Sequence, residues 1–555
     1  MPGGDRPFPF RDFYEGFQLV LALVPSLLLP HSPCCMTTPS FNSPDNSPKK
    51  NLGSPQGWQP IDRVALVLAA ILAVLIGLLA MSGDHTAPRI RDFSWQERQI
   101  GAEDTAFLLT FSRPMNRESV ERNLQIDPPL PGKFSWAGRR MAYTLEAPAP
   151  YGTEFSMQLR GARDRFSEPG DGRDMGLFEA SFQSRDRAFI YLGVEGEQAG
   201  RLVLNNLTRE EEIVLTPDNL VVMDYQPYPE GDRILFSARD RDAENATGAD
   251  QRLYTVTTGI QIAAPASGPG EEDWGDRRST EPQEAGIVEL LLDNQEYQNL
   301  KFDLSPNGEL VVVQRANRQN PADFGLWVVE SGKDPYRIET EPGGDFLIAP
   351  DSTSVAMAQG QGMAILPLES GGDPLDFLAQ FGMVLSFARD GSAATMVQFT
   401  PDPETPTQSL FLVTSQGTEQ ELLTTDGSIL DAMFNASKTL VYCLFTVLLP
   451  GDEYIEQPIL TAINLETEMR TDLLKLPAQR DIQMSLAPDG LGILFDQTVA
   501  SDSPTAAGPV TGMDGRAIAT SRLWFFPLVL DDVGNPLPVD PEELPLSGLR
   551  PQWLP

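Results

Sequence analysis

The sequence predicts an all-β protein with one N-terminal transmembrane helix, a β-sandwich, and a ring of seven four-stranded sheets closed by the C-terminal strand. Three features of the 555-residue chain predict this order. An apolar run without charge lies near the N-terminus, short alternating strands follow it, and a strand pattern then repeats to the end. A chain this long exceeds the roughly 250 to 300 residues of a single core, so several domains are expected.

The apolar run extends from Val64 to Met81, with Leu72 near its middle, and contains no charged residue. As a helix rising about 1.5 Å per residue, it nearly crosses a hydrocarbon core of roughly 30 Å. We therefore predict a single membrane anchor over residues 61–83. Basic residues precede the run and Asp84 follows it, which indicates an N-terminus inside the cytoplasm and later domains outside it.

Residues 1–60 are rich in Ser, Pro and Asn after Met36. Segments with so little aliphatic content do not fold alone, so we predict a disordered cytoplasmic tail. The earlier apolar run, Leu19 to Leu29, is too short to span a membrane and is interrupted by Pro25. Met36 is therefore an alternative start of the chain.

Composition limits the classes of function. Lys and Arg total 41 against 78 Asp and Glu, and the net charge of −37 lies after the anchor. Such an acidic excess repels phosphate backbones, so no nucleic-acid partner is expected. The two histidines are His31 and His85, and Cys443 is the only cysteine after the anchor. Histidine-based catalysis and an internal disulfide are thereby excluded from the later domains, and we expect neither an enzyme nor a cofactor.

Residues 87–185 contain five short runs with period-2 alternation, separated by Pro and Gly turns. The runs are Phe107–Phe111, Lys133–Trp136, Met141–Leu145, Phe155–Leu159 and Phe178–Phe182. This pattern is typical of a β-sandwich. Between the first two runs, Asn116 is placed to cap one short helix.

Three motifs of this region occur in a fixed order. They are Phe111-Ser112-Arg113-Pro114-Met115-Asn116, Leu124-Gln125-Ile126-Asp127-Pro128 and Tyr151-Gly152-Thr153-Glu154-Phe155. The succession resembles the bacterial Ig-like domain of the surface-layer type. That resemblance implies a spacer or adhesive module without catalytic residues, which would serve here as a stalk.

From residue 187 to 555 the chain repeats a unit of an apolar strand, a turn, a second strand and a third strand. The visible turns are Pro227–Gly231, Ser305–Gly308, Ala349–Ser352, Ala388–Gly391, Asn435–Lys438 and Ala487–Gly490. In such turns Pro presets φ, Asp or Asn bonds its own backbone, and Gly accepts positive φ. The spacing of the units is that of four-stranded β-propeller blades.

A further unit is incomplete at its start, because no strand and turn precede Phe189–Leu192. The last residues, Arg550–Pro555, have the pattern of the missing strand. We therefore predict that the strand of Trp553 pairs with the strand of Ile190 and closes a seven-bladed propeller. Closure removes the open sheet edges that would otherwise template aggregation.

The turns resemble the Ser-Pro-Asp-Gly turns of TolB-like and WD-like bacterial propellers, although Ala349, Ala388 and Asn435 depart from that motif. The resemblance implies a protein-binding platform. Two inserts, 265–286 and 500–520, interrupt the blades and are predicted to be mobile loops.

Asp240, Asp242 and Glu244 lie close together in the chain. Hard cations prefer carboxylate oxygens, so these residues are a candidate calcium site, although their spacing is not that of an EF-hand. The alternative is a solvated acidic loop without a metal.

Together these features predict a scaffold anchored in the inner membrane, with its C-terminal domains in the periplasm or another space outside the cytoplasm. Its expected partners are envelope proteins. The alternative function is a propeller that binds or processes an envelope glycan, because two carboxylates at its funnel could cleave a glycosidic bond. Exposed aromatics beside acids would favour the glycan, and an exposed apolar patch would favour a protein.

Overall fold

The computed structural model describes residues 60–81, 87–165, 174–242, 250–260, 283–400, 406–451, 453–479, 481–500, 518–531 and 534–555. Its contacts divide the chain into two units, Met1–Pro88 and Arg89–Pro555. The predicted tail up to residue 59 and most of both predicted inserts, namely 261–282 and 501–517, lie outside the described residues.

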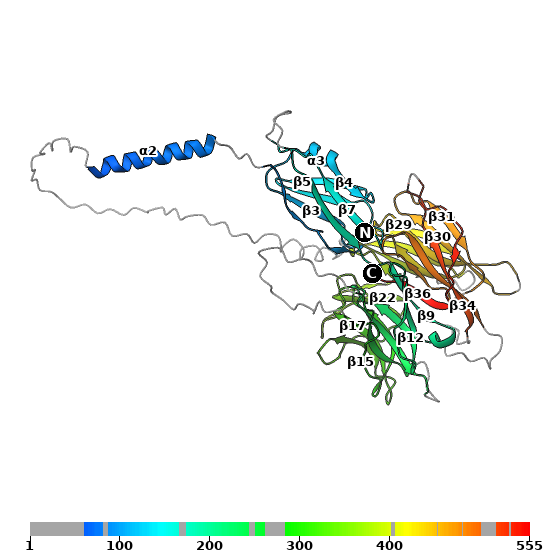
Figure 1. Cartoon of the computed structure of the whole chain (residues 1–555). Coiled ribbons are helices and arrows are strands. Elements are labelled where there is room, and N and C mark those ends of the chain that lie inside the picture. The colour runs from blue at the N-terminus through cyan, green and yellow to red at the C-terminus, as the bar shows by residue number, and fades with distance from the viewer. Residues whose placement is uncertain are drawn as a thin grey trace, which may run out of the picture. The chain divides into compact units, whose positions relative to one another are not determined.

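In the first unit, helix α2 (Pro60–Met81) covers the predicted anchor (Figure 1). Val64 and Leu72 are exposed on this helix. Within the described residues, however, no helix is both long enough and apolar enough to cross a membrane. The predicted membrane anchor from Val64 to Met81 is therefore not confirmed.

The second unit begins with two four-stranded sheets. The first, in the order β1-β3-β6-β5, contains β1 (Ile90–Phe93), β3 (Ala106–Phe111), β5 (Gly132–Ala137) and β6 (Arg140–Leu145). The second, in the order β2-β8-β7-β4, contains β2 (Gln99–Ile100), β4 (Leu124–Asp127), β7 (Glu154–Leu159) and β8 (Phe178–Ser184). Buried and exposed side chains alternate along β3 and β7, so each sheet turns one face to a common core.

The core of this sandwich is aromatic. Phe107, Phe155, Phe182 and Trp95 are buried in it. The rings of Phe155 and Phe182 stack with centroids 5.2 Å apart, and Trp95 meets Phe182 at 5.3 Å. Full burial of a side chain such as Phe contributes about 1.5 to 3 kcal/mol, so a few rings supply much of the stability of the sandwich.

A short helix, α3 (Arg117–Asn123), connects β3 to β4. The side chain of Asn116 accepts the backbone N–H of Ser119 at 3.1 Å and thereby caps the first turn. Val120 is buried in the sandwich core and fixes the helix against the sheets. The predicted short helix and its cap are confirmed.

Seven further four-stranded sheets, all antiparallel, follow in the described part of the chain. The first sheet contains β9 (Ala188–Gly193), β10 (Leu202–Asn206) and β11 (Glu211–Val214) together with the last strand, β36 (Gly548–Trp553), and the 3-10 turn η1 (Gly196–Gln198) follows β9. The next three contain β12 (Leu220–Pro227), β13 (Arg233–Asp240), β14 (Arg252–Thr257) and β15 (Val288–Leu292); β16 (Tyr297–Leu304), β17 (Leu310–Asn317), β18 (Phe324–Glu330) and β19 (Tyr336–Arg337); and β20 (Phe346–Ile348), β21 (Ser354–Gln359), β22 (Gly362–Pro367) and β23 (Asp376–Leu378). The final three contain β24 (Met383–Phe387), β25 (Ala393–Phe399), β26 (Gln408–Thr414) and β27 (Glu419–Thr425); β28 (Ile429–Phe434), β29 (Leu440–Leu448), β30 (Glu456–Asn464) and β31 (Arg470–Lys475); and β32 (Met484–Leu486), β33 (Gly492–Ala500), β34 (Ile518–Pro527) and β35 (Glu542–Glu543).

Each turn identified in the sequence joins the first two strands of a sheet and ends on a residue with positive φ. In four turns that residue is a glycine, for example Gly490 with φ of 72°. In the other two it is Ser352, with φ of 58°, or Lys438, with φ of 56°. A Cβ atom makes positive φ costly. The two turns that end on Ser352 or Lys438 therefore adopt a conformation that these residues disfavour.

Apolar clusters join the sheets into a ring. Each cluster is shared by two consecutive sheets, and the cluster containing Phe189, Leu494 and Trp553 joins the final sheet to the first. First strands of several neighbouring sheets contact one another, for example β16 with β20 and β24 with β28, so they form the inner wall of the ring. Figure 1 shows the last strand, β36, beside β9, although the two are far apart in sequence. The prediction of an all-β fold is confirmed, and the arrangement is propeller-like.

The closing strand is bonded on both of its sides. Along β9, Gln552 lies opposite Ile190 and Trp553 lies opposite Phe189. The backbone N–H of Trp553 donates to Ser485 Oγ at 3.0 Å in the final sheet. On the other side, Tyr225 Oη of β12 bonds the carbonyls of Ile190, at 3.1 Å, and Arg550. The C-terminal strand therefore forms hydrogen bonds with three consecutive sheets of the ring.

Candidate functional site

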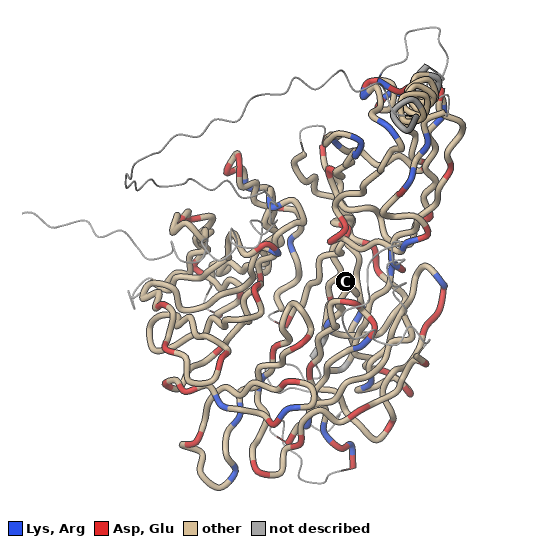
Figure 2. The backbone as a smooth tube through the Cα atoms, turned by 90° about the vertical axis from the view of Figure 1, so that its left-hand side faces the viewer, with Lys and Arg blue, Asp and Glu red and all other residues tan. Residues whose placement is uncertain are grey.

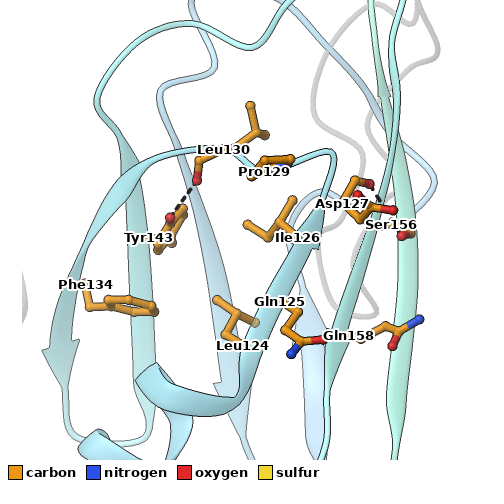
Figure 3. A pocket seen from close by; sticks show the side chains of 10 residues that line it. All are labelled: Leu124, Gln125, Ile126, Asp127, Pro129, Leu130, Phe134, Tyr143, Ser156 and Gln158. Atoms are coloured by element: carbon orange, nitrogen blue, oxygen red, sulfur yellow. Dashed lines mark hydrogen bonds between the residues drawn. The ribbon is translucent and has the colours of Figure 1, made fainter. Parts of the chain in front are cut away.

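A groove of about 650 Å³ lies on the sandwich between strands β4 and β5 (Figure 3). Its lining residues are Leu124, Gln125, Ile126, Asp127, Pro129, Leu130, Phe134, Tyr143, Ser156 and Gln158. Figure 3 shows Leu124, Ile126 and Phe134 in the space between β4 and β5, whereas Gln125 and Gln158 lie together on the other side of β4. The groove therefore has an apolar floor and a polar rim. We call it the edge groove.

Both strands beside the edge groove are sheet edges. Strand β4 pairs with β7, and β5 pairs with β6, and within the described residues neither has a second strand partner. Edge strands present backbone N–H and C=O groups that can bond another extended chain. The edge groove thus combines apolar side chains with backbone groups that are able to pair.

Interactions at its ends hold the edge groove open. Tyr143 Oη donates to the carbonyl of Leu130 at 2.7 Å and fixes the connection from β4 to β5. Burial raises the pKa of Tyr143, and nearby Glu146 adds to the rise, so this phenol stays a donor at neutral pH. Beyond the other end, Trp136 Nε1 donates to Glu121 of α3 at 2.8 Å. These contacts set the spacing of the walls in the absence of any partner.

A second set of polar groups lies along the inner wall of the ring. Asp303 is 5% exposed and accepts bonds from Gln226 Nε2 at 2.9 Å and from the N–H of Ile348 at 2.6 Å, which links three sheets. Asp496 is 1% exposed and accepts the N–H groups of Gln483 at 2.8 Å and Arg550 at 2.7 Å. Burial raises the pKa of both carboxyls, that of Asp496 to about 6. Because each accepts several bonds, we assign both a structural role.

Asp431 differs from these acids. It is the residue that follows a register shift in β28. Asp224 in β12 and Lys301 in β16 follow similar register shifts in their own strands. Burial raises the pKa of Asp431 to about 6, and its described bond comes from the N–H of its neighbour Ala432, at 2.7 Å. By contrast, Asp224 lies 3.8 Å from Arg550. Bulges are common beside functional sites, and a desolvated carboxyl that forms no ion pair with the described residues is a candidate acid–base group.

Exposed apolar side chains occur between the second and third strands of two neighbouring sheets, at the end of β25 and in the loop from β29 to β30. Phe399 is 47% exposed, and Leu449, Tyr454 and Ile455 are 39%, 66% and 38% exposed. The hydroxyl of Tyr454 donates to the carboxylate of buried Glu456 at 2.5 Å. The exposed apolar side chains are a feature expected of a protein-binding surface. Tyr454 beside Glu456 places an aromatic ring next to an acid, which is a feature expected of a glycan-binding site.

The predicted calcium site stays a prediction, because the structure describes only two of its three residues. Asp240 forms an ion pair with Arg252 at 3.2 Å, and Asp242 is exposed. Glu244 lies outside the described residues. No group of three His, Cys, Asp or Glu side chains that could hold a metal ion occurs in the described ranges. Figure 2 shows acidic residues spread over many loops with basic residues among them, in keeping with solvated acidic loops.

The connection between the sandwich and the ring involves residues that the sequence did not single out. Asp489, in the turn Ala487–Gly490, accepts the N–H of Tyr151 at 3.0 Å and a guanidinium N–H of Arg187 at 2.5 Å. Its side chain is 2% exposed. The turn motif predicts a hairpin, but nothing in the sequence indicates that its Asp binds a distant domain. The edge groove was also missed, because the alternation along β4 extends over only four residues.

No protein-family model and no curated protein matches the chain. Solved structures are similar at low identity. They include an oligogalacturonate lyase from Vibrio parahaemolyticus (12% identity, 56% of this chain and 87% of that chain, TM-score 0.38), TolB from Acinetobacter baumannii (10%, 64% and 81%, 0.34) and an oligogalacturonate lyase in complex with manganese (12%, 60% and 83%, 0.39). TolB is thus among the similar structures. Scores this low say nothing about activity, and the Ig-like resemblance stays a prediction.

Proposed function

We propose that this chain is a non-catalytic protein-binding scaffold, built as an Ig-like sandwich fused to a seven-bladed propeller. The observation that carries the proposal is the edge groove, which is lined by both apolar and polar side chains and has on each side a strand edge without a second partner among the described strands. Such a groove suits an extended peptide better than a globular surface, because the peptide can bond a strand edge and place alternate side chains in the channel.

The dimensions define the expected ligand. Strand β4 has four residues, which at about 3.3 Å per residue gives an edge of roughly 13 Å. A segment of about four residues can therefore add to β4, and each net backbone bond contributes about 0.5 to 1.5 kcal/mol. Leu124, Ile126 and Phe134 are half-buried and leave apolar surface for two side chains of the peptide.

The net charge of the chain further limits which proteins can be its partner. The chain carries a net charge of −37, so an acidic partner would be repelled and a neutral or basic one would be attracted. We therefore expect an extended segment of another envelope protein, with an apolar residue at every second position and few acidic residues.

The test compares two Leu→Glu variants of the full chain. Leu124→Glu places a carboxylate in the edge groove, whereas Leu108→Glu changes an exposed residue of β3, which is 44% exposed, and serves as the control. Each immobilised protein is incubated with an envelope extract, and captured proteins and glycans are identified by mass spectrometry. The proposal requires a protein that the wild type and Leu108→Glu retain and Leu124→Glu loses, with thermal unfolding showing that both variants fold.

Two results would count against this function. Equal capture by Leu124→Glu and the wild type would remove the edge groove from the interaction. Recovery of polysaccharide without a stoichiometric protein would favour the glycan alternative.

The alternative function is binding or cleavage of a glycan at the propeller, and Asp431 is the observation that favours it. A carboxyl with a pKa of about 6 that forms no ion pair with the described residues has the character of a general acid. The discriminating experiment measures reducing ends released from envelope polysaccharide by the wild type and by Asp431→Asn. If the wild type releases reducing ends and Asp431→Asn does not, the glycan-cleaving alternative is established. If neither protein releases reducing ends from any envelope polysaccharide, the scaffold function is favoured.

A location outside the cytoplasm belongs to the same proposal. Its support is the apolar surface exposed on α2, including Val64, Leu72 and Ile76, since exposed apolar surface of this kind marks a contact with protein or lipid. Fractionation of expressing cells should recover the chain with the envelope, and protease added to spheroplasts should degrade it. Recovery with the cytosol would contradict this location.

A further inference from the structure

A second, smaller cavity lies at the seam where the last sheet of the ring meets the first. Its volume is about 260 Å³, and its lining residues are Arg187, Phe189, Asn205, Leu207, Leu494, Phe525, Leu544, Pro545, Leu546 and Trp553. Phe189 and Asn205 come from β9 and β10, Leu494 and Phe525 from β33 and β34, and Trp553 from the closing strand. We call it the seam cavity. It is separate from the edge groove of the proposed function.

The walls of the seam cavity are mainly aromatic and aliphatic. Trp553 meets the ring of Phe189 at 5.5 Å and that of Phe525 at 6.3 Å, in both cases edge to face. Leu544 and Leu546 pack against the same cluster. Apolar cavities of about 150 Å³ accept benzene, so a cavity of this size has room for an aromatic ring and a small substituent.

Polar groups around the seam cavity keep unused hydrogen-bond donors. Trp553 is 7% exposed, and its Nε1 has no hydrogen-bond partner within the described residues. A buried indole N–H normally finds an acceptor. Arg187 donates to Asp489 through one terminal nitrogen, and the described chain provides no bond for its other guanidinium N–H groups. The seam cavity therefore offers hydrogen-bond donors from Trp553 and Arg187.

We propose that the seam cavity binds a small, mainly apolar molecule that carries one carboxylate. The apolar part lies among Phe189, Phe525 and Leu546, and the carboxylate accepts from Trp553 Nε1 and from the free side of Arg187. Arginine favours carboxylates because its N–H groups form charge-assisted bonds with them. A pocket with apolar walls and a few polar groups is the usual form of a small-molecule site.

The test uses the full chain with benzoate, hexanoate and the neutral analogue benzyl alcohol, and measures binding by ligand-detected NMR and calorimetry. Benzoate or hexanoate should saturate a single site with a dissociation constant below about 10 mM, and benzyl alcohol should bind more weakly. Trp553→Phe keeps an aromatic ring but removes the donor, so affinity for the carboxylates should fall at least about fivefold.

Trp524→Phe is the matched control. Trp524 Nε1 is also buried without a partner among the described residues, but Trp524 does not line the seam cavity. Its substitution should leave the affinity unchanged. If Trp553→Phe does not fold, Leu546→Phe narrows the cavity instead and should abolish binding. Absence of binding for both carboxylates, or equal affinities for the wild type and Trp553→Phe, would overturn the proposal.

Discussion

Replacing Asp431 by Asn removes one charge from the inner wall of the ring without changing the size of the side chain. Asn can keep the described bond, because its Oδ1 can accept the N–H of Ala432 as the carboxylate does at 2.7 Å. The substitution therefore isolates the cost of holding a desolvated carboxylate at this position. We expect it to stabilise the protein at neutral pH.

The magnitude follows from the pKa. Burial raises the pKa of Asp431 to about 6 in the folded chain, against about 3.9 in the unfolded chain, and each unit corresponds to about 1.36 kcal/mol. The upper limit of the cost is thus about 3 kcal/mol, and about 1 to 3 kcal/mol is expected because the side chain is only partly buried. The folded state binds the proton of Asp431 more tightly than the unfolded state does. The resulting stabilisation of the fold is therefore complete below about pH 4 and is lost as the pH rises to about 6.

The assay is urea-induced unfolding of the wild type and Asp431→Asn at several values between pH 4 and pH 7.5. The difference in free energy of unfolding should be near zero at about pH 4 and should grow to about 1 to 3 kcal/mol in favour of Asp431→Asn above about pH 6. Asp390→Asn is a control of opposite sign, because Lys438 and Ser392 lower the pKa of Asp390 to about 2 even though burial opposes the change. A constant difference across this range, or destabilisation at pH 7.5, would refute the reasoning.

Three further substitutions test other parts of the fold by urea unfolding. Trp553→Ala removes a 7% exposed ring from the seam and should cost about 3 to 5 kcal/mol; a loss below about 1 kcal/mol would mean that closure does not depend on this ring. Asp489→Ala leaves Arg187 without its carboxylate and should cost about 3 kcal/mol, with faster protease cleavage at residues 185–187; unchanged cleavage would argue against a rigid junction. Asn116→Ala removes the cap of α3 and should cost about 1 kcal/mol, whereas no change would show that the helix does not need its cap.

The sequence predicts the strands of the ring well because its turns and strands have separate chemical signals. The run Leu253–Val256 falls within β14, and Phe189–Leu192 falls within β9. Sheet order follows from the same repeat, since consecutive strands in one blade pair locally. The long-range pairing of β36 with β9 could be inferred because one unit lacked a strand. The register of this pairing could not be inferred, because it depends on a bulge between Leu549 and Gln552 for which the sequence shows no pattern.

The candidate sites were not predictable in the same way. The edge groove depends on the distance between β4 and β5, which belong to different sheets, and Leu124 and Ile126 alternate over only four residues. Asp431 is one acid among 78 Asp and Glu residues, and its raised pKa arises from burial rather than from a motif. Asp240 and Asp242 formed a visible cluster in the sequence, and in the structure Asp240 forms an ion pair with Arg252. Proximity along the chain is a weak guide to proximity in a sheet structure.

The junction between the sandwich and the ring limits how a scaffold of this kind can work. Strand β8 ends at Ser184 and β9 begins at Ala188, so three residues connect the domains and can span only about 10 Å. Each of the three is paired: Arg185 with Glu103, Asp186 with Arg209, and Arg187 with Asp489. A flexible stalk needs a longer linker with unpaired residues. The sandwich and the ring should therefore move as one body, so a partner in the edge groove would meet the propeller at a fixed distance and orientation.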